Sequence, residues 1–260
     1  VYMKSVLITG ASSGIGYEFA KIYAKNGYNL VITARRQENL ENIREELESY
    51  SVKIETIVLD LSKEGAAKKL YENVKEKGIV IDTLINNAGF GLYGNFIETD
   101  VDREAEMIDL NIKSLVILTK LFLKDMIAID KGEILNVASI AAFQPGPLMS
   151  VYYASKSFVL SFSEAVRNEI RKTNVNISVL CPGPTATEFE RSANLEKSTL
   201  FTRIKVMTPE KVALIGYKGL QKKKSIIITG KINSTLIFLN RFVPREVIVN
   251  VARKLQELKK

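Results

Sequence analysis

The sequence predicts an α/β fold in which a doubly wound parallel sheet of about seven strands carries helices on both faces. Two observations predict it. Segments with strand character alternate with segments with helix character along most of the chain, and the strand segments are apolar nearly throughout. A strand that is apolar on both of its faces belongs in a parallel sheet that is buried on both sides. At 260 residues the chain is long enough for one such domain.

The strand and helix segments follow one another in a regular order. The predicted strands are short apolar runs at Ser5–Thr9, Asn29–Thr33, Lys53–Leu59, Thr83–Asn86, Glu133–Ala138, Asn176–Leu180 and Ser225–Thr229. The predicted helices lie between them, at Ile15–Asn26, Gln37–Glu48, Ala66–Lys77, Arg103–Met126, Val151–Lys172 and Pro209–Lys222. Repeated strand–helix–strand units of this kind build a parallel sheet with helices on both faces. We therefore expect a single domain over residues 1–260.

Composition limits the chemistry open to the chain. Hydrophobic residues make up 46% of it and charged residues 25%, which is typical of a globular protein. There is no histidine, so catalysis would use tyrosine, lysine, serine or carboxylate groups, and we expect no metal site. The single cysteine, Cys181, excludes an intrachain disulfide and is interpreted as a small buried hydrophobe.

The ends of the chain and its hydropathy bear on location. The opening Val1-Tyr2-Met3-Lys4 lacks the apolar segment and cleavage site of a signal peptide, and we take Met3 as the natural start. No uninterrupted apolar run reaches the roughly 18 residues that a spanning helix needs. We therefore expect a cytoplasmic protein.

A glycine-rich segment directly follows the first predicted strand. It reads Thr9-Gly10-Ala11-Ser12-Ser13-Gly14-Ile15-Gly16 and opens a helix. Glycine permits a sharp turn and a close approach to a pyrophosphate, and the helix N-terminus offers unpaired N–H groups. Its position between a strand and a helix favours a dinucleotide site over a purely structural turn. The expected contacts are Gly10, Ser12, Ser13, Gly14, Ile15 and Gly16.

The end of the second predicted strand indicates which dinucleotide is bound. The strand ends Thr33-Ala34-Arg35-Arg36, and no acidic residue follows until Glu38. Sites for NAD place a carboxylate here for the ribose 2′-hydroxyl, whereas a guanidinium matches the 2′-phosphate of NADP. We predict NADP(H), with Arg35 as the phosphate contact and Arg36 near the adenine. The alternative is a pair of solvated arginines at a helix start.

Tyr152 and Lys156 form the candidate catalytic pair. They stand four residues apart at the start of a predicted helix, hence on one face of it. A lysine cation within about 4–6 Å favours the phenolate and lowers the pKa of a tyrosine. Tyr152 would then give a proton to a carbonyl oxygen, or take one from an alcohol. Tyr153 points about 100° away around the helix and is expected to pack against a neighbouring element or subunit.

These segments together resemble the short-chain dehydrogenase/reductase family, of the NADP-preferring type. The resemblance spans residues 4 to about 230, in the family's order. Its matching segments are Thr9–Gly16, Asp60-Leu61, Asn86-Asn87-Ala88-Gly89, Asn111, Ser139, Tyr152-Tyr153-Ala154-Ser155-Lys156 and Pro182-Gly183. It implies a Rossmann-like fold and hydride transfer between a nicotinamide and a carbonyl or secondary alcohol.

The resemblance also implies roles for individual residues. Asp60 and Leu61 would contact the adenine, although Asp60 could instead cap the next helix. Asn87, Ala88 and Gly89 would line the ribose, and Asn86 would steady the sheet. Ser139 would hold the substrate oxygen against Tyr152. Asn111 would hold a water that relays protons to Lys156, unless it is simply a satisfied amide. The backbone and hydroxyl groups of Pro182, Gly183, Thr185 and Thr187 would contact the nicotinamide amide.

The substrate side is less determined. We expect a substrate loop over 188–208, with Phe189, Leu195, Leu200 and Phe201, and a pocket that also includes Phe90, Tyr93, Phe143 and Met149. Each of these aromatic and apolar residues could equally be core. The resemblance further implies a homodimer or homotetramer assembled through the helices around Arg103–Met126 and Val151–Lys172.

The excess positive charge lies near the C-terminus. Residues 1–196 carry 22 basic and 26 acidic residues, whereas residues 197–260 carry 15 and 3. We expect a basic helical extension over 231–260 that either packs on the domain or a second subunit, or contacts an anionic membrane or acidic partner. In the second case, deletion of 231–260 would abolish co-sedimentation with anionic liposomes.

Several functions stay open at this point. Within enzymes, the alternatives are a 3-oxoacyl or acyl-thioester reductase, a lipid- or steroid-type ketone reductase, and a sugar or amino-acid alcohol dehydrogenase. A non-catalytic NADP-sensing protein is a further alternative, although such proteins typically lose the tyrosine or lysine. We expect no nucleic-acid partner, because neither a base-reading motif nor a platform for base stacking is evident.

Overall fold

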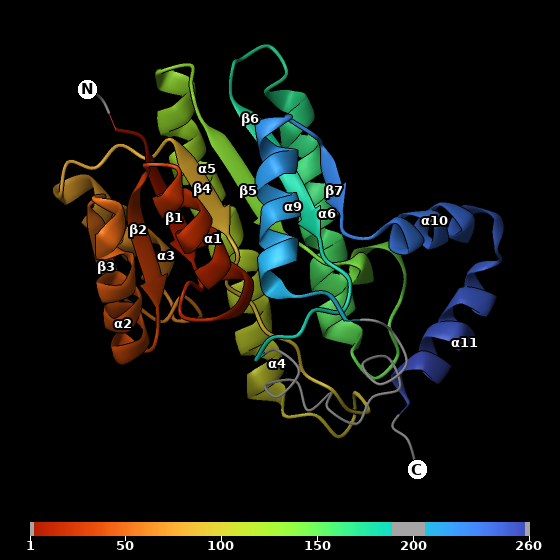
Figure 1. Cartoon of the computed structure of the whole chain (residues 1–260). Coiled ribbons are helices and arrows are strands. Elements are labelled where there is room, and N and C mark those ends of the chain that lie inside the picture. Colours follow the sequence, from red (N-terminus) through yellow and green to blue (C-terminus); the bar gives the residue numbers. More distant parts are fainter. Residues whose placement is uncertain (1–2, 189–205, 258–260) are drawn as a thin grey trace.

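A parallel sheet forms the centre of the molecule in the computed structural model, which describes residues 3–188 and 206–257. Within these residues the sheet has seven strands, all parallel, in the order β3-β2-β1-β4-β5-β6-β7. The strands are β1 (Ser5–Thr9), β2 (Asn29–Ala34), β3 (Ile54–Val58), β4 (Thr83–Asn86), β5 (Glu133–Val137), β6 (Asn176–Cys181) and β7 (Ile226–Ile228). The predicted doubly wound fold is confirmed (Figure 1).

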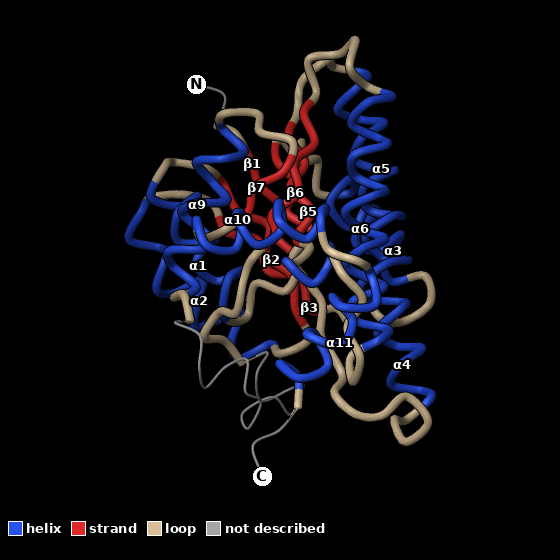
Figure 2. The backbone as a smooth tube through the Cα atoms, turned by 90° about the vertical axis from the view of Figure 1, so that its right-hand side faces the viewer, coloured by secondary structure: helices blue, strands red, loops and turns tan. Residues whose placement is uncertain are grey.

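Helices cover both faces of this sheet. One layer holds α1 (Gly14–Lys25), α2 (Gln37–Leu47) and α9 (Pro209–Gln221). The opposite layer holds α3 (Ala66–Glu76), α4 (Val101–Ile108), α5 (Leu115–Ala128) and α6 (Ser150–Glu169). Figure 2 shows the strands edge-on between the two layers.

The sheet has an apolar core on each side because neighbouring residues of a strand point to opposite faces. In β1, Val6 and Ile8 pack into the cluster that contains Phe19 of α1. Leu7, between them, packs into the other cluster with Leu70 of α3. All five side chains are fully buried, which explains why the strand segments of the sequence are apolar at nearly every position.

The predicted single helix Arg103–Met126 is interrupted. Between α4 and α5 the chain makes a π-helical turn over Asp109–Ser114 (η2), which adds a residue to the turn around Asn111. The Asn111 side chain pairs there with the backbone of Phe90, on the loop after β4. The correction has a physical reason: a π-turn keeps a helix-like apolar spacing, so the sequence pattern does not distinguish it from an α-helix.

Polar side chains link the middle strands to the helices behind them. Asn86 Nδ2 of β4 donates to Asn136 Oδ1 of β5 (2.9 Å) and to Thr119 Oγ1 of α5 (3.0 Å). Asn136 Nδ2 in turn donates to Ser163 Oγ of α6 (2.8 Å). These groups are buried, so each bond satisfies an atom that would otherwise be costly to desolvate. Asn86 thus steadies the sheet.

After β7 the chain leaves the sheet as two helices joined by a short turn. The helices are α10 (Lys231–Leu239) and α11 (Arg245–Gln256), and the turn between them includes the 3₁₀ helix η4 (Asn240–Phe242). We call residues 231–257 the C-terminal arm; it extends away from β7 (Figure 1). Within the described part of the chain, no helix, in the arm or elsewhere, is long and apolar enough to cross a membrane.

Candidate active site

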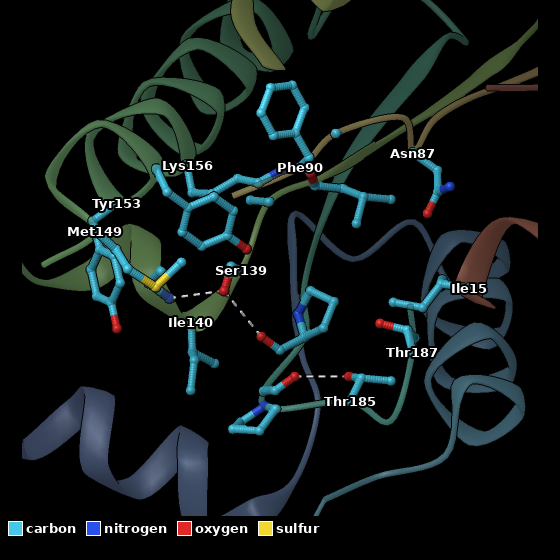
Figure 3. Close-up of a pocket in the computed structure, with 18 of the residues that line it drawn as sticks. Ile15, Asn87, Phe90, Ser139, Ile140, Met149, Tyr153, Lys156, Thr185 and Thr187 are labelled. Carbon is cyan, nitrogen blue, oxygen red and sulfur yellow. Dashed lines mark hydrogen bonds between the residues drawn. The ribbon is translucent and has the colours of Figure 1, made fainter. Parts of the chain in front are cut away.

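A pocket of about 930 Å³ lies at the carboxyl ends of the strands. The loops after β1 to β6 line it, and residues of the C-terminal arm form another part of its wall. Strand order reverses around β1, whose neighbours are β2 and β4. Ligands of open parallel sheets bind in the crevice at such a reversal. Figure 3 shows Ser139 and Lys156 on one side of this pocket and Ile15, Thr187 and Asn87 on the other.

The glycine loop has the backbone geometry that a phosphate cradle needs. Gly10 and Gly14 have φ of +65° and +57°, and both line the pocket together with Ser12, Ser13 and Ile15. Gly16 lies beneath the loop instead: a Cβ there would stand 2.3 Å from the carbonyl oxygen of Gly10 and 2.6 Å from Asn87 Nδ2. The first turn of α1 has no acidic side chain to compete with an anion.

The two arginines after β2 have different surroundings. Arg36 donates to the hydroxyls of Ser12 and Ser13 (3.3 Å each) and to Glu188 Oε2 (2.7 Å). Arg35 points elsewhere, with its Nη1 3.9 Å from Glu106 Oε1. Both side chains line the pocket. It is therefore Arg36, not Arg35, whose guanidinium lies against the glycine loop.

Asp60, after β3, lines the pocket and also shapes its own turn. Its Oδ1 accepts from the backbone N (3.0 Å) and the hydroxyl (2.7 Å) of Ser62. Burial pushes its pKa upward, but the Ser62 hydrogen bonds and the charge of Arg35 together lower the pKa below its ordinary value. Leu61 lines the pocket beside it, as do Asn87, Ala88 and Gly89. Asn87 Nδ2 donates to the carbonyls of Thr9 (3.0 Å) and Gly10 (3.1 Å), so it fixes the start of the glycine loop.

Ser139, Tyr152 and Lys156 come together in the pocket wall. Lys156 is 5% exposed, its Nζ donates to the carbonyl of Val137 (3.1 Å), and it lies 5.7 Å from the centre of the Tyr152 ring. Ser139 Oγ accepts from the backbone N of Ala141 (3.1 Å), so this serine caps a 3₁₀ turn while it lines the pocket. The structure therefore brings the three side chains together, as predicted.

The charge balance of this group differs from the prediction. Burial raises the pKa of Tyr152 well above its ordinary value, a hydrogen bond with Ser139 lowers it in part, and Tyr153 raises it further. Burial also lowers the pKa of Lys156 to about 8. The predicted lowering of the Tyr152 pKa by Lys156 is therefore not found, because desolvation dominates the pKa of both groups.

Tyr153 and Asn111 are both held by protein groups. The hydroxyl of Tyr153 bonds to the side chain of Gln256 in α11, so this tyrosine packs against a neighbouring element as expected. Asn111 is 1% exposed, donates to the Phe90 carbonyl (3.0 Å) and to Ser155 Oγ (3.1 Å), and accepts from the Phe90 N (3.1 Å). A Cβ on Gly89 would stand 2.8 Å from Asn111 Oδ1 and 3.3 Å from Lys156 Nζ, so both atoms lie next to Gly89.

The loop after β6 forms the next part of the wall. Pro182, Gly183, Thr185 and Thr187 all line the pocket, and Thr185 Oγ1 donates to the Gly183 carbonyl (2.8 Å). Cys181, at the end of β6, is fully buried, and burial raises the pKa of its thiol to about 12. It is therefore the buried hydrophobe that the sequence predicts.

Two of the four residues predicted for the substrate side do line the pocket, namely Phe90 and Met149. Tyr93 does not line it, because its hydroxyl donates to the backbone carbonyl of Gln256 (3.0 Å) and its ring packs beside Tyr153. Phe143 does not line it either, because it packs into the cluster of Val159 and Leu160. The predicted loop residues Phe189, Leu195, Leu200 and Phe201 lie outside the described residues.

The sequence reasoning missed one part of the wall. Aliphatic side chains of the C-terminal arm line the pocket, including Leu236, Val247, Val251 and Leu255. The signal was present, since the last three recur every four residues along α11. Such a stripe marks the inner face of an amphipathic helix, but it does not say which surface that face meets.

Comparisons with known proteins agree with this geometry. The short chain dehydrogenase family model matches residues 4–198. "Sulfoacetaldehyde reductase 2" of Chromohalobacter salexigens is 40% identical over 187 residues, which cover 71% of this chain and 73% of that protein. "NADP-dependent 3-hydroxy acid dehydrogenase" of Schizosaccharomyces pombe is 34% identical over 245 residues, covering 90% and 92%.

A solved structure repeats nearly the whole fold. A short-chain dehydrogenase from Sphingobium yanoikuyae in complex with NADPH superimposes with a TM-score of 0.82 at 26% identity, covering 94% of this chain and 97% of that one. The seven-stranded sheet, the glycine loop after β1, the Ser139–Tyr152–Lys156 group and these matches lead to one assignment. The chain belongs to the short-chain dehydrogenase family.

Proposed function

We propose that this protein is an NADP(H)-dependent oxidoreductase that interconverts a carbonyl compound and its secondary alcohol, with Tyr152 as general acid and base. One observation carries the proposal: Ser139, Tyr152 and Lys156 line the same pocket as the glycine loop and Arg36. A proton donor thus shares one cavity with a cradle for a dinucleotide. The S. pombe relative is named for NADP dependence and the S. yanoikuyae structure contains NADPH, which supports this cofactor.

The residues of the pocket fit NADP(H). The glycine loop has positive φ at Gly10 and Gly14 and leads into the N-terminus of α1, whose backbone N–H groups would bind a pyrophosphate. Arg36 with Ser12 and Ser13 provides one cation and two hydroxyls for a 2′-phosphate, which would replace the Glu188 carboxylate that Arg36 and Ser13 bind. The adenine would contact Asp60 and Leu61, the ribose Asn87, Ala88 and Gly89, and the nicotinamide Pro182, Gly183, Thr185 and Thr187, as the family resemblance implies; all of these residues line the pocket.

When bound, NADP(H) supplies or accepts the hydride. In reduction, Ser139 donates a hydrogen bond to the carbonyl oxygen and holds it beside Tyr152. The Tyr152 hydroxyl gives its proton to that oxygen as the carbonyl carbon gains the hydride, so that a secondary alcohol forms. A buried tyrosine of raised pKa stays protonated until that moment. Lys156 in its ammonium form stabilises the resulting phenolate.

Tyr152 must then regain a proton. Lys156 Nζ and Asn111 Oδ1 both lie close to Gly89. The π-turn places Asn111 there. We propose that Lys156 passes its proton to Tyr152 and then takes up a new proton from the side on which Gly89 lies. Asn111 is the positioning residue for this step.

The test is a panel of ketones, 3-oxoacyl thioesters and alcohols, monitored by NADPH absorbance, with NADH in parallel. We expect turnover with NADPH and a preference over NADH of at least about tenfold, because a charged hydrogen bond to the 2′-phosphate contributes about 1.5–3 kcal/mol. Comparable turnover with both cofactors would refute the NADP assignment. Tight NADPH binding without any turnover would favour the NADP-sensing alternative.

Partner contacts are a separate proposal. We propose a homodimer or homotetramer that uses α4, α5 and α6, on which Val101 (77% exposed) and Phe158 (41%) present apolar side chains to solvent. Light scattering should give two or four times the chain mass; a monomer would contradict it. We also propose that the chain forms a single domain over residues 1–260. Residues 188–208 are its proposed substrate loop.

The outer side of the arm supports a proposed membrane contact. Ile232 (76% exposed), Phe238 (55%) and Phe242 (74%) do not line the pocket, and Lys231 and Arg241 lie beside them in the sequence. Such a surface suits an anionic lipid interface. Phe242→Ser should reduce co-sedimentation with anionic liposomes at low salt, and it spares the pocket wall that deletion of 231–260 would remove. If the parent protein never binds such liposomes, the contact is wrong.

A further inference from the structure

The wall of the pocket is divided by charge. Among the described residues that line it, the charged ones are Arg35, Arg36, Asp60, Lys156 and Glu188. All five belong to the loops and helices that surround the proposed cofactor and the catalytic tyrosine. The lining that comes from the C-terminal arm is uncharged, and apart from Asn233, Asn240 and Gln256 it is aliphatic.

We call six of these aliphatic residues the apolar wall: Leu236, Ile237, Val247, Ile248, Val251 and Leu255. In α11 they recur at helical spacing, so they form one stripe. The charged side chains of that helix, including Arg245, Arg253 and Lys254, are exposed and do not line the pocket. The helix therefore turns its apolar side toward the cavity.

Packing within the protein buries the apolar wall only in part. Val247, Val251 and Leu255 are 47%, 52% and 37% exposed, although they lie on the inner face of the helix. Of α11, only Ala252 and Gln256 are buried. Aliphatic side chains that face a cavity instead of a core gain from burial only when a ligand or partner covers them.

The arm is fixed where it meets the catalytic helix. The Gln256 side chain bonds to the hydroxyl of Tyr153, the residue after Tyr152, and its backbone carbonyl accepts from Tyr93 (3.0 Å). In the turn η4 between the two helices of the arm, Asn240 Nδ2 donates to Gln144 Oε1 (3.0 Å), on the segment that follows Ser139. These bonds tie the arm to residues next to Ser139 and Tyr152, and the apolar wall lines the same cavity as those two side chains.

We infer that the substrate is a ketone, or the corresponding alcohol, that carries a large uncharged apolar body, and that this body lies against the apolar wall. The inference rests on the proposed function, because it is the reacting carbonyl that Tyr152 and Ser139 place. The wall continues the catalytic pocket without a break in the cavity, so a single molecule can contact both. A charged group at this position would lose its hydration and meet no countercharge from the arm.

The first experiment is a substrate series with NADPH. Methyl ketones of increasing chain length (butanone, octanone, decanone) keep the reacting group constant and lengthen only the apolar body. We expect kcat/KM to rise at least about tenfold from butanone to decanone, since each buried methylene adds a factor of up to about four. An oxo acid as long as decanone, with its carboxylate at the far end, should fall at least about tenfold below decanone. A flat series, or an oxo acid equal to decanone, overturns the inference while turnover itself leaves the proposed function standing.

The second experiment locates the effect. Val251→Ser should raise KM for decanone about tenfold, leave kcat unchanged and spare butanone, because the lost contacts to the apolar body are equally strong in the ground state and the transition state. Asn250→Ser, at the exposed neighbouring position of the same helix, is the matched control and should change nothing. Equal effects of the two variants would contradict the inference. A change of oligomeric state in Val251→Ser, measured by light scattering, would assign the wall to a second copy of the chain and overturn it as well.

A readout without turnover separates the two proposals. In the presence of NADP⁺, decanol should raise the melting temperature more than butanol at equal concentration, and Val251→Ser should remove the difference. If decanol raises the melting temperature more than butanol but no compound is turned over, the inference of an apolar ligand is supported and the proposed reaction is wrong. If the two alcohols act alike, the apolar wall does not bind the substrate.

Discussion

The glycine loop and the C-terminal arm border the same pocket but are built in opposite ways. The loop is fixed by contacts that leave no room: a Cβ on Gly16 would collide with the Gly10 carbonyl, and Asn87 holds the loop from the end of the neighbouring strand β4. The arm exposes large aliphatic side chains and is held to the domain by few polar contacts. If the proposed function is right, the position of the pyrophosphate depends on a closely packed backbone, whereas substrate choice depends on the side chains of the arm.

The largest effect should come from Gly16→Ala. The added methyl group has no space, so we expect NADPH affinity to fall at least about a hundredfold and stability to drop by about 1–3 kcal/mol. Gly27→Ala is the control, because no atom lies within 4 Å of its Cβ position and only its φ of +75° is strained. Fluorescence titration and urea unfolding measure both quantities. Similar losses in the two variants would show that the loop is not closely packed.

The next effect separates the two arginines. Arg36→Ala should weaken NADPH binding about tenfold to a hundredfold and leave NADH binding unchanged, since hydrogen bonds to a charged group contribute about 1.5–3 kcal/mol. Arg35→Ala is the matched variant and should cost less, because Arg35 lies away from Ser12 and Ser13. Titration of each variant with NADPH and with NADH measures the affinities that distinguish the two arginines. A larger loss in Arg35→Ala would restore the assignment that the sequence predicted.

The third prediction concerns pH. Burial lowers the pKa of Lys156 from 10.5 to about 8, so its ammonium form is present below that pH and lost above it. Because the ammonium stabilises the phenolate of Tyr152, kcat/KM for reduction should fall as pH rises through about 8, by up to about tenfold per unit. A profile that stays level to pH 10 would remove Lys156 from this role.

Stability gives an independent check on the same group. Between about pH 8 and 10.5 the unfolded chain holds a proton on Lys156 that the folded protein has released. The free energy of unfolding should therefore rise with pH in that range, relative to Lys156→Met. An unchanged difference between the two proteins would place the pKa of Lys156 near its ordinary value.

The smallest effect should come from the arm. Gln256→Leu removes the hydrogen bond to Tyr153, so we expect at most about 1.5 kcal/mol of lost stability and NADPH affinity within about twofold of the parent. KM for a long-chain ketone should rise severalfold, because the apolar wall is no longer fixed. If NADPH affinity falls as far as in Gly16→Ala, the two regions are not independent.

The same contrast explains what could be predicted from the sequence. The strands, the glycine loop and the Tyr152–Lys156 pair were predictable because steric demands and helical spacing leave a local mark. The orientations of Arg35 and Arg36 were not, since successive residues after a strand can point either way. The π-turn at Asn111 has an α-like apolar pattern. The arm showed its amphipathic stripe, but only the fold shows that the stripe meets the pocket.

The measurement closest to the central claim is reduction of the best ketone of the panel by Tyr152→Phe, which removes one oxygen atom and keeps the ring. We predict that kcat falls about 10²–10⁴-fold, the usual contribution of a general acid. NADPH affinity, measured by fluorescence in the same preparation, should stay within about twofold of the parent. If Tyr152→Phe reduces the ketone as fast as the parent protein, Tyr152 is not the proton donor and the mechanism is wrong.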